Sequence, residues 1–502
     1  MRPASHVFAI VLAGLIAMTT PLIATTDISR DAPDTGPSGA SSAFTSNDAP
    51  IALARQRVGE GRFAEAENML RHDSGKPHPE AGEMLDIIGR LRAAYDLDAA
   101  GLLARVSEAI PDATGDVLER WRQAGQVKYR SIDGRIAYFG REPANLLRFC
   151  DEAKRRRRIS PPSPPGWQLE EHLARVIATS SREKKAEVVP IRHRVRYRLS
   201  IPAGAPYVMP GAVVRVWLPF PQECERQGSV RLVSSSPRHQ VIAPNGAASG
   251  GAAQRTIYFE QRVAEASRPI LFEEVFEFTS PAYYPTLEDA QARPLPANWA
   301  GGNLAERPPH ILFTPQLRKT VAQVVGDEPN PLKKARRIFH FVAEKVAYCA
   351  EEEYSTIPSL SDKALASGRG DCGVQAMLFI TMCRAAGVPA RWQSGWQTKR
   401  ENCDMHDWAE FYVDPWGWLP ADPSYGLRES DNQRVREFYF GHQDSYRLIV
   451  NRDYGWPLVP PKRSLRSEPL DFQRGEVEID GHNLYFPHWQ YDINVEWLDE
   501  GP

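Results

Sequence analysis

Gly370-Asp371-Cys372-Gly373 opens a long apolar run that ends at Gly387, and this stretch predicts a buried helix. Asp371 is suited to cap the first turn of that helix, which places Cys372 within the turn. Unpaired backbone N–H groups and the positive end of the helix dipole stabilise a thiolate there, so we expect the pKa of Cys372 to be lowered. The same N–H groups can accept negative charge that develops on a carbonyl oxygen.

A histidine and an aspartate follow in the order that thiol catalysis needs. His406 begins a segment with the aromatic, alternating character of a strand, and Asp422 ends the strand that returns from the next turn. A thiolate attacks, a base holds its proton, and a carboxylate orients the base. The sequence therefore predicts Cys372 as nucleophile, His406 as base and Asp422 as the orienting acid. His340 and His442 are the next candidates for the base.

The turn between the two strands decides whether His406 and Asp422 can meet. If Pro415 to Gly417 form a three-residue loop, Asp422 falls opposite Glu410. Asp422 then shares a face with His406 but lies too far along the strand for direct contact. A bulge or another register must close that gap.

These linked motifs resemble the transglutaminase-like core domain over roughly residues 330 to 430. The resemblance implies a papain-like fold and a Cys-His-Asp triad at Cys372, His406 and Asp422. Asp407 departs from the family pattern, because many relatives carry a small residue there, and its charge would raise the pKa of His406. The matching segments are Gly370-Asp371-Cys372, Arg384 to Arg391, His406-x-Trp408-x-Glu410 and Gly417 to Pro423.

The rest of the chain predicts an α+β protein, in which the papain-like transglutaminase core is preceded by a β-sandwich and an N-terminal helical module. A turn at Asp133-Gly134 should join two short strands within the helical module. Alternating segments between 190 and 280 indicate the sandwich. In chain order we expect a signal peptide or N-terminal anchor (1–24), a disordered tether (25–50), a helical module (51–158), a linker (159–189), the β-sandwich (190–280), a Pro-rich connection (281–330), the catalytic core (331–430) and a β-rich extension (431–502).

Charge and the first residues bear on location and partners. A net charge of -2 and a sequence pI of 6.7 argue against a bulk nucleic-acid binder. A basic start and an apolar run to Ala24 are typical of a secretory signal peptide, so we expect a secreted or periplasmic protein. An uncleaved N-terminal anchor is the alternative. No membrane contact is expected beyond this segment.

The cysteines and acidic residues suggest no cofactor. Setting Cys372 aside from the six cysteines leaves an odd five, and a disulfide between Cys349 and Cys403 stays open. No cluster has the spacing of metal ligands, so neither a metal nor another cofactor is expected. We interpret Glu351-Glu352-Glu353 as a solvated turn rather than a calcium site.

The predicted chemistry is acyl transfer through a thioester, with a protein or peptide amide as substrate. Water as the second nucleophile makes a peptidase or amidase, which we favour; a lysine amine makes a cross-linking protein-glutamine gamma-glutamyltransferase. A non-catalytic binding scaffold with the same fold is the further alternative. Tyr348 is a candidate second oxyanion donor, as are the nearby tryptophans. Trp392, Trp396 and Trp408 could line an acceptor channel, although core packing is the favoured interpretation.

Overall fold

The computed structural model describes residues 49–72, 79–158, 168–246, 253–296, 299, 302–399 and 402–499. The expected signal peptide, all but the last two residues of the expected tether, and residues 159–167 of the linker lie outside these ranges. The chain divides into two compact units, Met1–Gln168 and Leu169–Pro502. Helices and several separate sheets make it an α+β protein. Within the described ranges, no helix is long and apolar enough to cross a membrane.

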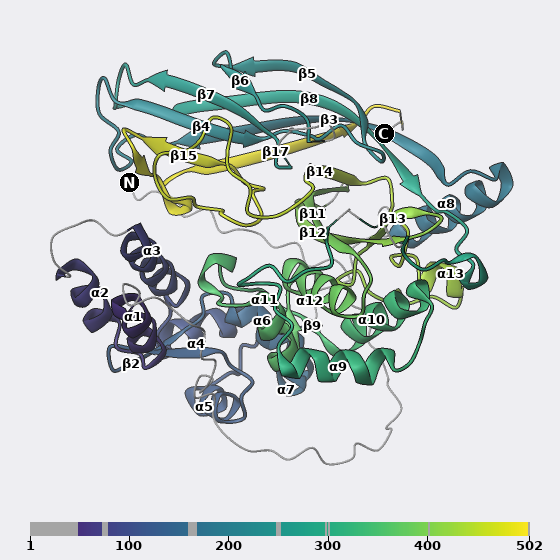
Figure 1. Cartoon of the computed structure of the whole chain (residues 1–502). Coiled ribbons are helices and arrows are strands. Elements are labelled where there is room, and N and C mark those ends of the chain that lie inside the picture. Colours follow the sequence, from purple (N-terminus) through teal and green to yellow (C-terminus); the bar gives the residue numbers. More distant parts are fainter. Residues whose placement is uncertain are drawn as a thin grey trace. The chain divides into compact units, whose positions relative to one another are not determined.

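The first unit is helical apart from one hairpin (Figure 1). Asp133 and Gly134 form the turn of that hairpin with φ values of 50° and 79°, which suits a two-residue turn between strands. The predicted hairpin is thus confirmed. The elements are α1 (Ala49–Gly59), α2 (Phe63–His72), α3 (Pro79–Ala94), α4 (Ala99–Ala109), α5 (Gly115–Gln123), β1 (Tyr129–Ile132), β2 (Arg135–Tyr138), α6 (Glu142–Phe149) and α7 (Asp151–Arg156).

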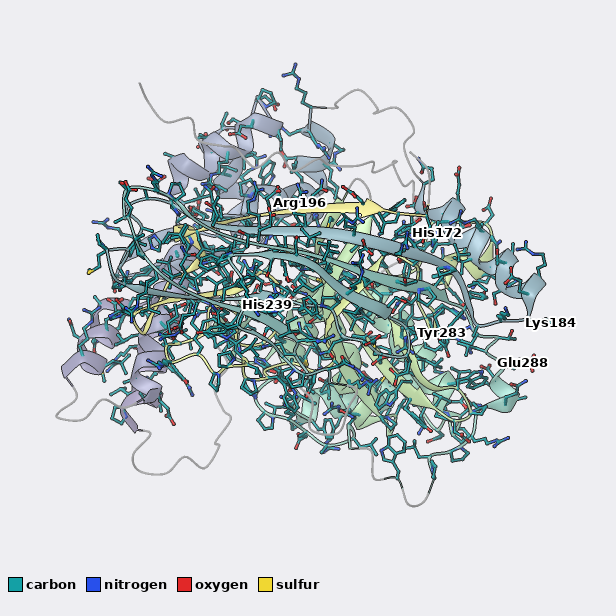
Figure 2. The ribbon with its side chains drawn as sticks, turned by 90° about the horizontal axis from the view of Figure 1, so that it is seen from above. His172, Lys184, Arg196, His239, Tyr283 and Glu288 are labelled. Carbon is teal, nitrogen blue, oxygen red and sulfur yellow. The ribbon has the colours of Figure 1, made fainter. Side chains whose placement is uncertain are left out.

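The second unit contains two sheets that enclose a shared apolar core. Their strand orders are β16-β15-β4-β7-β6 and β17-β3-β8-β5. Alternation along β3 buries Val195 and Tyr197 and leaves Arg196 on the outer face (Figure 2). The elements here are α8 (Leu169–Glu183), β3 (Glu187–Ile201), β4 (Val213–Pro219), β5 (Gly228–Ser236), β6 (Val241–Ile242), β7 (Thr256–Arg262) and β8 (Ile270–Tyr283).

The C-terminal part of the chain supplies strands to both sheets rather than a separate layer. Strand β15 (Glu476–Ile479) pairs with β4 and with β16 (His482–Asn483), and β17 (Gln490–Trp497) pairs with β3 (Figure 1). A short 3-10 helix, Phe486–His488, precedes β17. Segments almost 300 residues apart in sequence therefore close the same sandwich.

A third sheet, in the order β13-β12-β11-β14, belongs to the region predicted as the catalytic core, and α12 contacts β11 and β12. Strand β14 extends this sheet beyond residue 430 by pairing with β11. The elements are α9 (Pro315–Val325), α10 (Pro331–Lys345), β9 (Ala347–Tyr348), α11 (Leu360–Ser367), β10 (Arg369–Gly370), α12 (Cys372–Ala385), β11 (Ala390–Lys399), β12 (Asn402–Val413), β13 (Gly417–Ala421), α13 (Gln433–Arg436) and β14 (Arg447–Asn451), with 3-10 turns at Asp289–Gln291 and Tyr354–Thr356.

Glu274 is a buried carboxyl group inside the sandwich. It alternates along β8 with Phe272 and Phe276, so it points between the sheets, and its side chain is fully buried. Neither carboxyl oxygen has a hydrogen-bond partner among the described residues. Burial therefore raises the pKa of Glu274 well above its ordinary value, and the native protein holds it neutral.

This gives a first testable prediction. Between about pH 4.3 and the raised native pKa, the native state binds a proton that the unfolded state has lost, so the free energy of unfolding falls as pH rises. Glu274→Met should remove that slope and raise the free energy of unfolding near neutral pH by about 1–3 kcal/mol. Denaturant unfolding at mildly acid and mildly alkaline pH measures both. Glu273→Met, which removes the outward carboxylate paired with Arg198, is the control. Equal pH slopes in wild type and Glu274→Met would contradict the prediction.

Candidate active site

Cys372 lies at the first position of α12, as the sequence predicts. Asp371 caps the helix by accepting the N–H of Val374 at 3.2 Å, which confirms the predicted N-cap. Nearly every residue of α12 is buried, including Cys372, whose exposed fraction is 8%. The thiol is thus held at a helix N-terminus but beneath the surface.

Tyr354 occupies the space in front of this helix end. Its hydroxyl accepts the N–H of Gly373 at 3.1 Å and lies 2.8 Å from Asp371 Oδ1. A side chain at position 373 would overlap the tyrosine ring, so glycine is required for this approach. Because Gly373 and Val374 donate to Tyr354 and Asp371, the N–H of Cys372 itself is the first-turn donor left without a partner among the described residues.

The thiol contacts a carboxyl group rather than an imidazole. Cys372 Sγ lies 3.5 Å from Asp407 Oδ2, and within the described ranges no hydrogen bond joins Cys372 to His406. Burial raises the pKa of Cys372 well above its ordinary value, and the nearby Asp407 and Asp371 carboxyl groups raise it further. The expected lowering of this pKa is therefore wrong: in this arrangement burial outweighs the helix dipole.

His406 and Asp422 are brought together. Val413 pairs with Gly417 and Ala409 with Ala421, so continuing this register places Asp422 opposite Trp408. The expected register, with Asp422 opposite Glu410, is wrong by two positions, and the difference removes the gap to His406. His406 Nε2 lies 2.7 Å from Asp422 Oδ2.

Asp422 is surrounded by hydrogen-bond donors. Its Oδ1 accepts the Ser424 hydroxyl at 2.7 Å and the Tyr425 N–H at 3.2 Å, and its Oδ2 lies 2.8 Å from Arg447 Nη1. Burial alone would raise the pKa of Asp422, but the positive charges of His406 and Arg447 and these hydrogen bonds hold it well below its ordinary value. Asp422 is therefore ionised.

An ionised Asp422 fixes the proton of the imidazole. A carboxylate only accepts, so Nε2 must donate, and Nδ1 of the neutral ring keeps its lone pair. Burial lowers the pKa of His406; Asp422 opposes this, and Arg447 and Lys399 lower the pKa further. The expectation that Asp407 raises this pKa is wrong, since the Asp407 carboxyl group is directed at Cys372 and Tyr354.

Arg447 and Gln473 are site residues that the local sequence patterns missed. Arg447 on β14 is buried and lies 3.5 Å from Asp444, so Asp444, Arg447, Asp422 and His406 form a continuous polar chain. Gln473 donates to the carbonyl oxygen of His406 at 2.9 Å and to Asp407 Oδ1 at 2.7 Å. Neither residue lies in a motif, because each reaches the site only through tertiary pairing.

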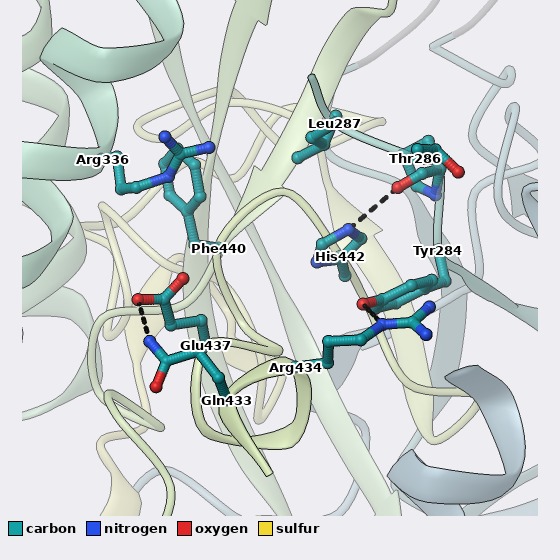
Figure 3. Close-up of a pocket in the computed structure, with 10 residues that line it drawn as sticks. Tyr284, Thr286, Leu287, Arg336, Gln433, Arg434, Glu437, Phe440 and His442 are labelled. Atoms are coloured by element: carbon teal, nitrogen blue, oxygen red, sulfur yellow. Dashed lines mark hydrogen bonds between the residues drawn. The ribbon is translucent and has the colours of Figure 1, made fainter. Parts of the chain in front are cut away.

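The other histidine candidates lie in different surroundings. His340 Nε2 contacts Glu437 at 3.4 Å. His442 lies within 3.1 Å of the carbonyl oxygens of Phe438 and Pro285, and burial lowers its pKa to about 4. His442 lines a pocket of about 310 Å³ with Arg336, Arg434 and Glu437, shown in Figure 3. Neither histidine has a hydrogen bond or ion pair to Cys372 in the described part of the chain.

The structure also locates the cysteines, the tryptophans and the tyrosine that the sequence analysis names. Cys349 and Cys403 are not joined by a disulfide, and the Cys349 thiol donates to Glu351 at 2.8 Å. Trp392, Trp396 and Trp408 are each at most 1% exposed, in agreement with core packing. Tyr348 is exposed.

The interpretation of Glu351-Glu352-Glu353 as a solvated turn is wrong for its first two residues. Glu351 and Glu352 are buried, with Glu351 paired to Lys363 and Glu352 accepting from Thr356. In the described ranges no group of three or more His, Cys, Asp or Glu side chains could hold a metal ion.

The sequence comparison covers the three predicted site residues. Residues 318–423 match the family model described as Transglutaminase-like superfamily. These residues form a transglutaminase-like core. The match runs from α9 to just beyond β13 and so includes Cys372, His406 and Asp422. This family assignment supports thiol acyl-transfer or peptidase chemistry.

Curated relatives of the chain are distant in sequence. An uncharacterized protein of Haemophilus influenzae is 24% identical over 223 residues, which cover 37% of this chain and 59% of that protein. The uncharacterized protein YebA of Bacillus subtilis is 22% identical over 131 residues, which cover 22% of this chain and 18% of YebA. The chain thus spans only part of the length of these relatives.

Solved structures resemble the chain weakly. A candidate cysteine protease from Cytophaga hutchinsonii gives a TM-score of 0.43 at 14% identity, over 63% of this chain and 93% of that chain. The periplasmic domain of TgpA from Pseudomonas aeruginosa gives a TM-score of 0.24 at 15% identity, over 55% of this chain and 98% of that chain. The family assignment of residues 318–423 therefore follows from the sequence match.

Proposed function

We propose that this chain is a thiol acyl-transfer enzyme that acts on protein or peptide amides, with hydrolysis as its main outcome. The observation that carries the proposal is the 2.7 Å contact between His406 Nε2 and Asp422 Oδ2. His406 lies on strand β12, and the next residue of that strand, Asp407, contacts the thiol of Cys372. A base oriented by a carboxylate and a thiol at a helix N-terminus are the groups that nucleophilic thiol catalysis uses.

The proposed reaction follows from the protons of these groups. His406 Nδ1 takes the proton of the Cys372 thiol, and Sγ attacks the carbonyl carbon of a carboxamide. The carbonyl oxygen carries the developing charge, for which the Cys372 N–H is the unengaged first-turn donor. The C–N bond then breaks as His406 returns the proton to the leaving amine or ammonia. A second nucleophile, water or an amine, gives a proton to His406 as it attacks the thioester carbonyl carbon; the C–S bond breaks, and His406 returns the proton to the Cys372 thiolate.

Productive geometry requires Cys372 and His406 to come within hydrogen-bond reach. In a protein without substrate, catalytic hydrogen bonds are often long and tighten only in the complex. The buried thiol and its contact with Asp407 also favour a second candidate, a non-catalytic binding scaffold. The two functions differ in whether an acyl-enzyme forms.

The deciding experiment is a thiol-directed glutamine-peptide probe applied to the full chain. We expect mass spectrometry to find the acyl group on Cys372, in wild type but not in Cys372→Ala. A wild-type protein that binds the peptide but forms no acyl-enzyme would support the scaffold and overturn the enzymatic proposal.

Water and amines compete for the thioester, which gives the second prediction. A bound amine prevails only where the site holds it in near-attack geometry and excludes water. Trp392, Trp396 and Trp408 are core residues, so they do not supply an amine channel here. A glutamine peptide with millimolar primary amine should therefore yield mainly hydrolysed product, measured by chromatography and mass. Predominantly amine-coupled product would instead establish cross-linking.

We also propose that the protein is exported. The basic start and apolar run of residues 1–24 support a signal peptide or an N-terminal anchor. Cell fractionation of the full chain, with and without residues 1–24, tests this. Retention of both forms in the cytoplasm would contradict export.

A further inference from the structure

Asp407 is a buried carboxyl group that contacts the proposed nucleophile. It follows His406 on β12, so the two side chains lie on opposite faces of the strand, and it is 2% exposed. Its Oδ2 lies 3.5 Å from Cys372 Sγ and 3.1 Å from the Tyr354 hydroxyl. Its Oδ1 accepts Gln473 Nε2 at 2.7 Å. The thiol therefore has the Asp407 carboxyl group as its side-chain hydrogen-bond partner.

The protons around Tyr354 indicate which form of Asp407 is present. The Tyr354 hydroxyl has one proton, yet it lies 2.8 Å from Asp371 Oδ1 and 3.1 Å from Asp407 Oδ2. Asp371 Oδ1 also accepts the N–H of Val374, as an ionised helix cap does, and it is the closer acceptor. The contact between Tyr354 and Asp407 is then a hydrogen bond only if Asp407 carries its own proton.

The surroundings of Asp407 favour the same neutral form. Burial raises the pKa of Asp407 well above its ordinary value, and the Asp371 carboxylate raises it further; the hydrogen bonds from Tyr354 and Cys372 oppose this only in part. No lysine or arginine forms an ion pair with Asp407 in the described part of the chain. The titratable and charged groups around it are Cys372, Asp371, Tyr354, Glu468 and Asp471, with Arg474 held by Glu468 and Glu353.

We propose that Asp407 is a further catalytic residue that gates the Cys372 thiol by its own protonation. As the neutral acid, Asp407 has one O–H, which donates to the Tyr354 hydroxyl while the thiol is protonated and turns to donate to the thiolate that forms when the thiol proton passes to His406. As the carboxylate, it faces Sγ with a like charge and opposes formation of the thiolate. The Asp407 proton stays on its oxygen throughout, so only the S–H bond breaks in this step. The catalytic meaning of the gate rests on the proposed function, whereas its effect on the thiol does not.

The gate has a consequence that alkylation measures directly. Asp407 and Cys372 share one buried site, so the charge on either group opposes ionisation of the other, and a thiol beside an ionised Asp407 is harder to ionise. Asp407→Asn cannot ionise, and its amide can donate to the thiolate while accepting Gln473. Iodoacetamide should therefore alkylate Cys372 at lower pH in this variant, and at least ~10-fold faster at any pH where Asp407 of the wild type is ionised.

The experiment uses the full chain and needs no substrate. Alkylation of Cys372 is followed by peptide mass spectrometry from about pH 5 to 10, with the fully buried Cys383 as internal reference. Asp404→Asn, which removes an exposed carboxylate from the same strand, is the matched control and should leave the profile unchanged. Asp407→Ala also cannot ionise but lacks the donor, so its profile should move in the same direction by less. If the Asn variant does not fold, the Ala variant carries the test.

The outcomes separate this inference from the proposed function. Profiles of Asp407→Asn and wild type that superimpose would overturn the gate, as would slower alkylation in the variant, since an ionised Asp407 would then be acting as a base. A shifted alkylation profile in a protein that turns over no amide would leave the gate standing and reject the enzymatic function. Amide turnover by a protein whose wild-type and Asp407→Asn alkylation profiles superimpose would support the enzymatic function and reject the gate.

Discussion

Replacing Cys372 with alanine is expected to lower amide turnover by about 10⁴-fold or more while the fold stays intact. Without Sγ no thioester forms, so the remaining site can only bind the amide and polarise its carbonyl group. The structural cost is small, because the hydrogen bond lost is a 3.5 Å contact with Asp407. Steady-state turnover, thermal unfolding and the intact mass of the acyl-enzyme measure these effects. Cys372→Ser should be similarly inactive.

Cys383 provides the matched control on the same helix. It is fully buried, whereas Cys372 is 8% exposed, and burial raises the pKa of both thiols. Cys383→Ala should therefore lose some stability but keep the chemistry. Iodoacetamide should still modify Cys372 faster than Cys383, because its access is greater and not because its pKa is low. A soluble, normally melting Cys372→Ala variant with full turnover would end the proposal.

The elements that carry the site were predictable because their signals are local. Asp371 before an apolar run and Gly387 after it define α12 within a few residues. Aromatic alternation and a turn likewise define the strands β12 and β13. Capping, helix termination and strand alternation depend on near neighbours, which a single sequence displays.

The missed features all depend on contacts between distant segments. Burial of Cys372 depends on everything that packs over α12, so the direction of its pKa could not be read from its helix position. Arg447 reaches Asp422 because β14 pairs with β11, and a carbonyl of β14 approaches so closely that only glycine fits at Gly395. The register error of two positions at Asp422 arose at the turn between β12 and β13. Val413 pairs with Gly417 there, and the residue types alone did not determine that pair.

His406→Ala should be nearly as damaging as loss of the thiol, at about 10⁴-fold, whereas Asp422→Asn should retain more activity. The histidine moves the proton, but the carboxylate only orients the ring and stabilises its charge. An asparagine oxygen can still accept a hydrogen bond from Nε2. The variant lacks the negative charge that forms the ion pair with Arg447 and accepts the Ser424 hydroxyl. Turnover of both variants, with folding checked by thermal unfolding, measures the difference.

The pH dependence of turnover distinguishes a catalytic role of His406 from a structural one. His406 must be neutral to accept the thiol proton, and burial lowers its pKa, so the acid limb of turnover should lie below the ordinary histidine range near pH 6.5. Asp422 opposes that lowering, so Asp422→Asn should move the acid limb to still lower pH. His442→Ala removes a buried histidine from the separate pocket and should leave the limb in place. Normal turnover by His406→Ala would instead locate the base elsewhere, with His340 the next residue to replace.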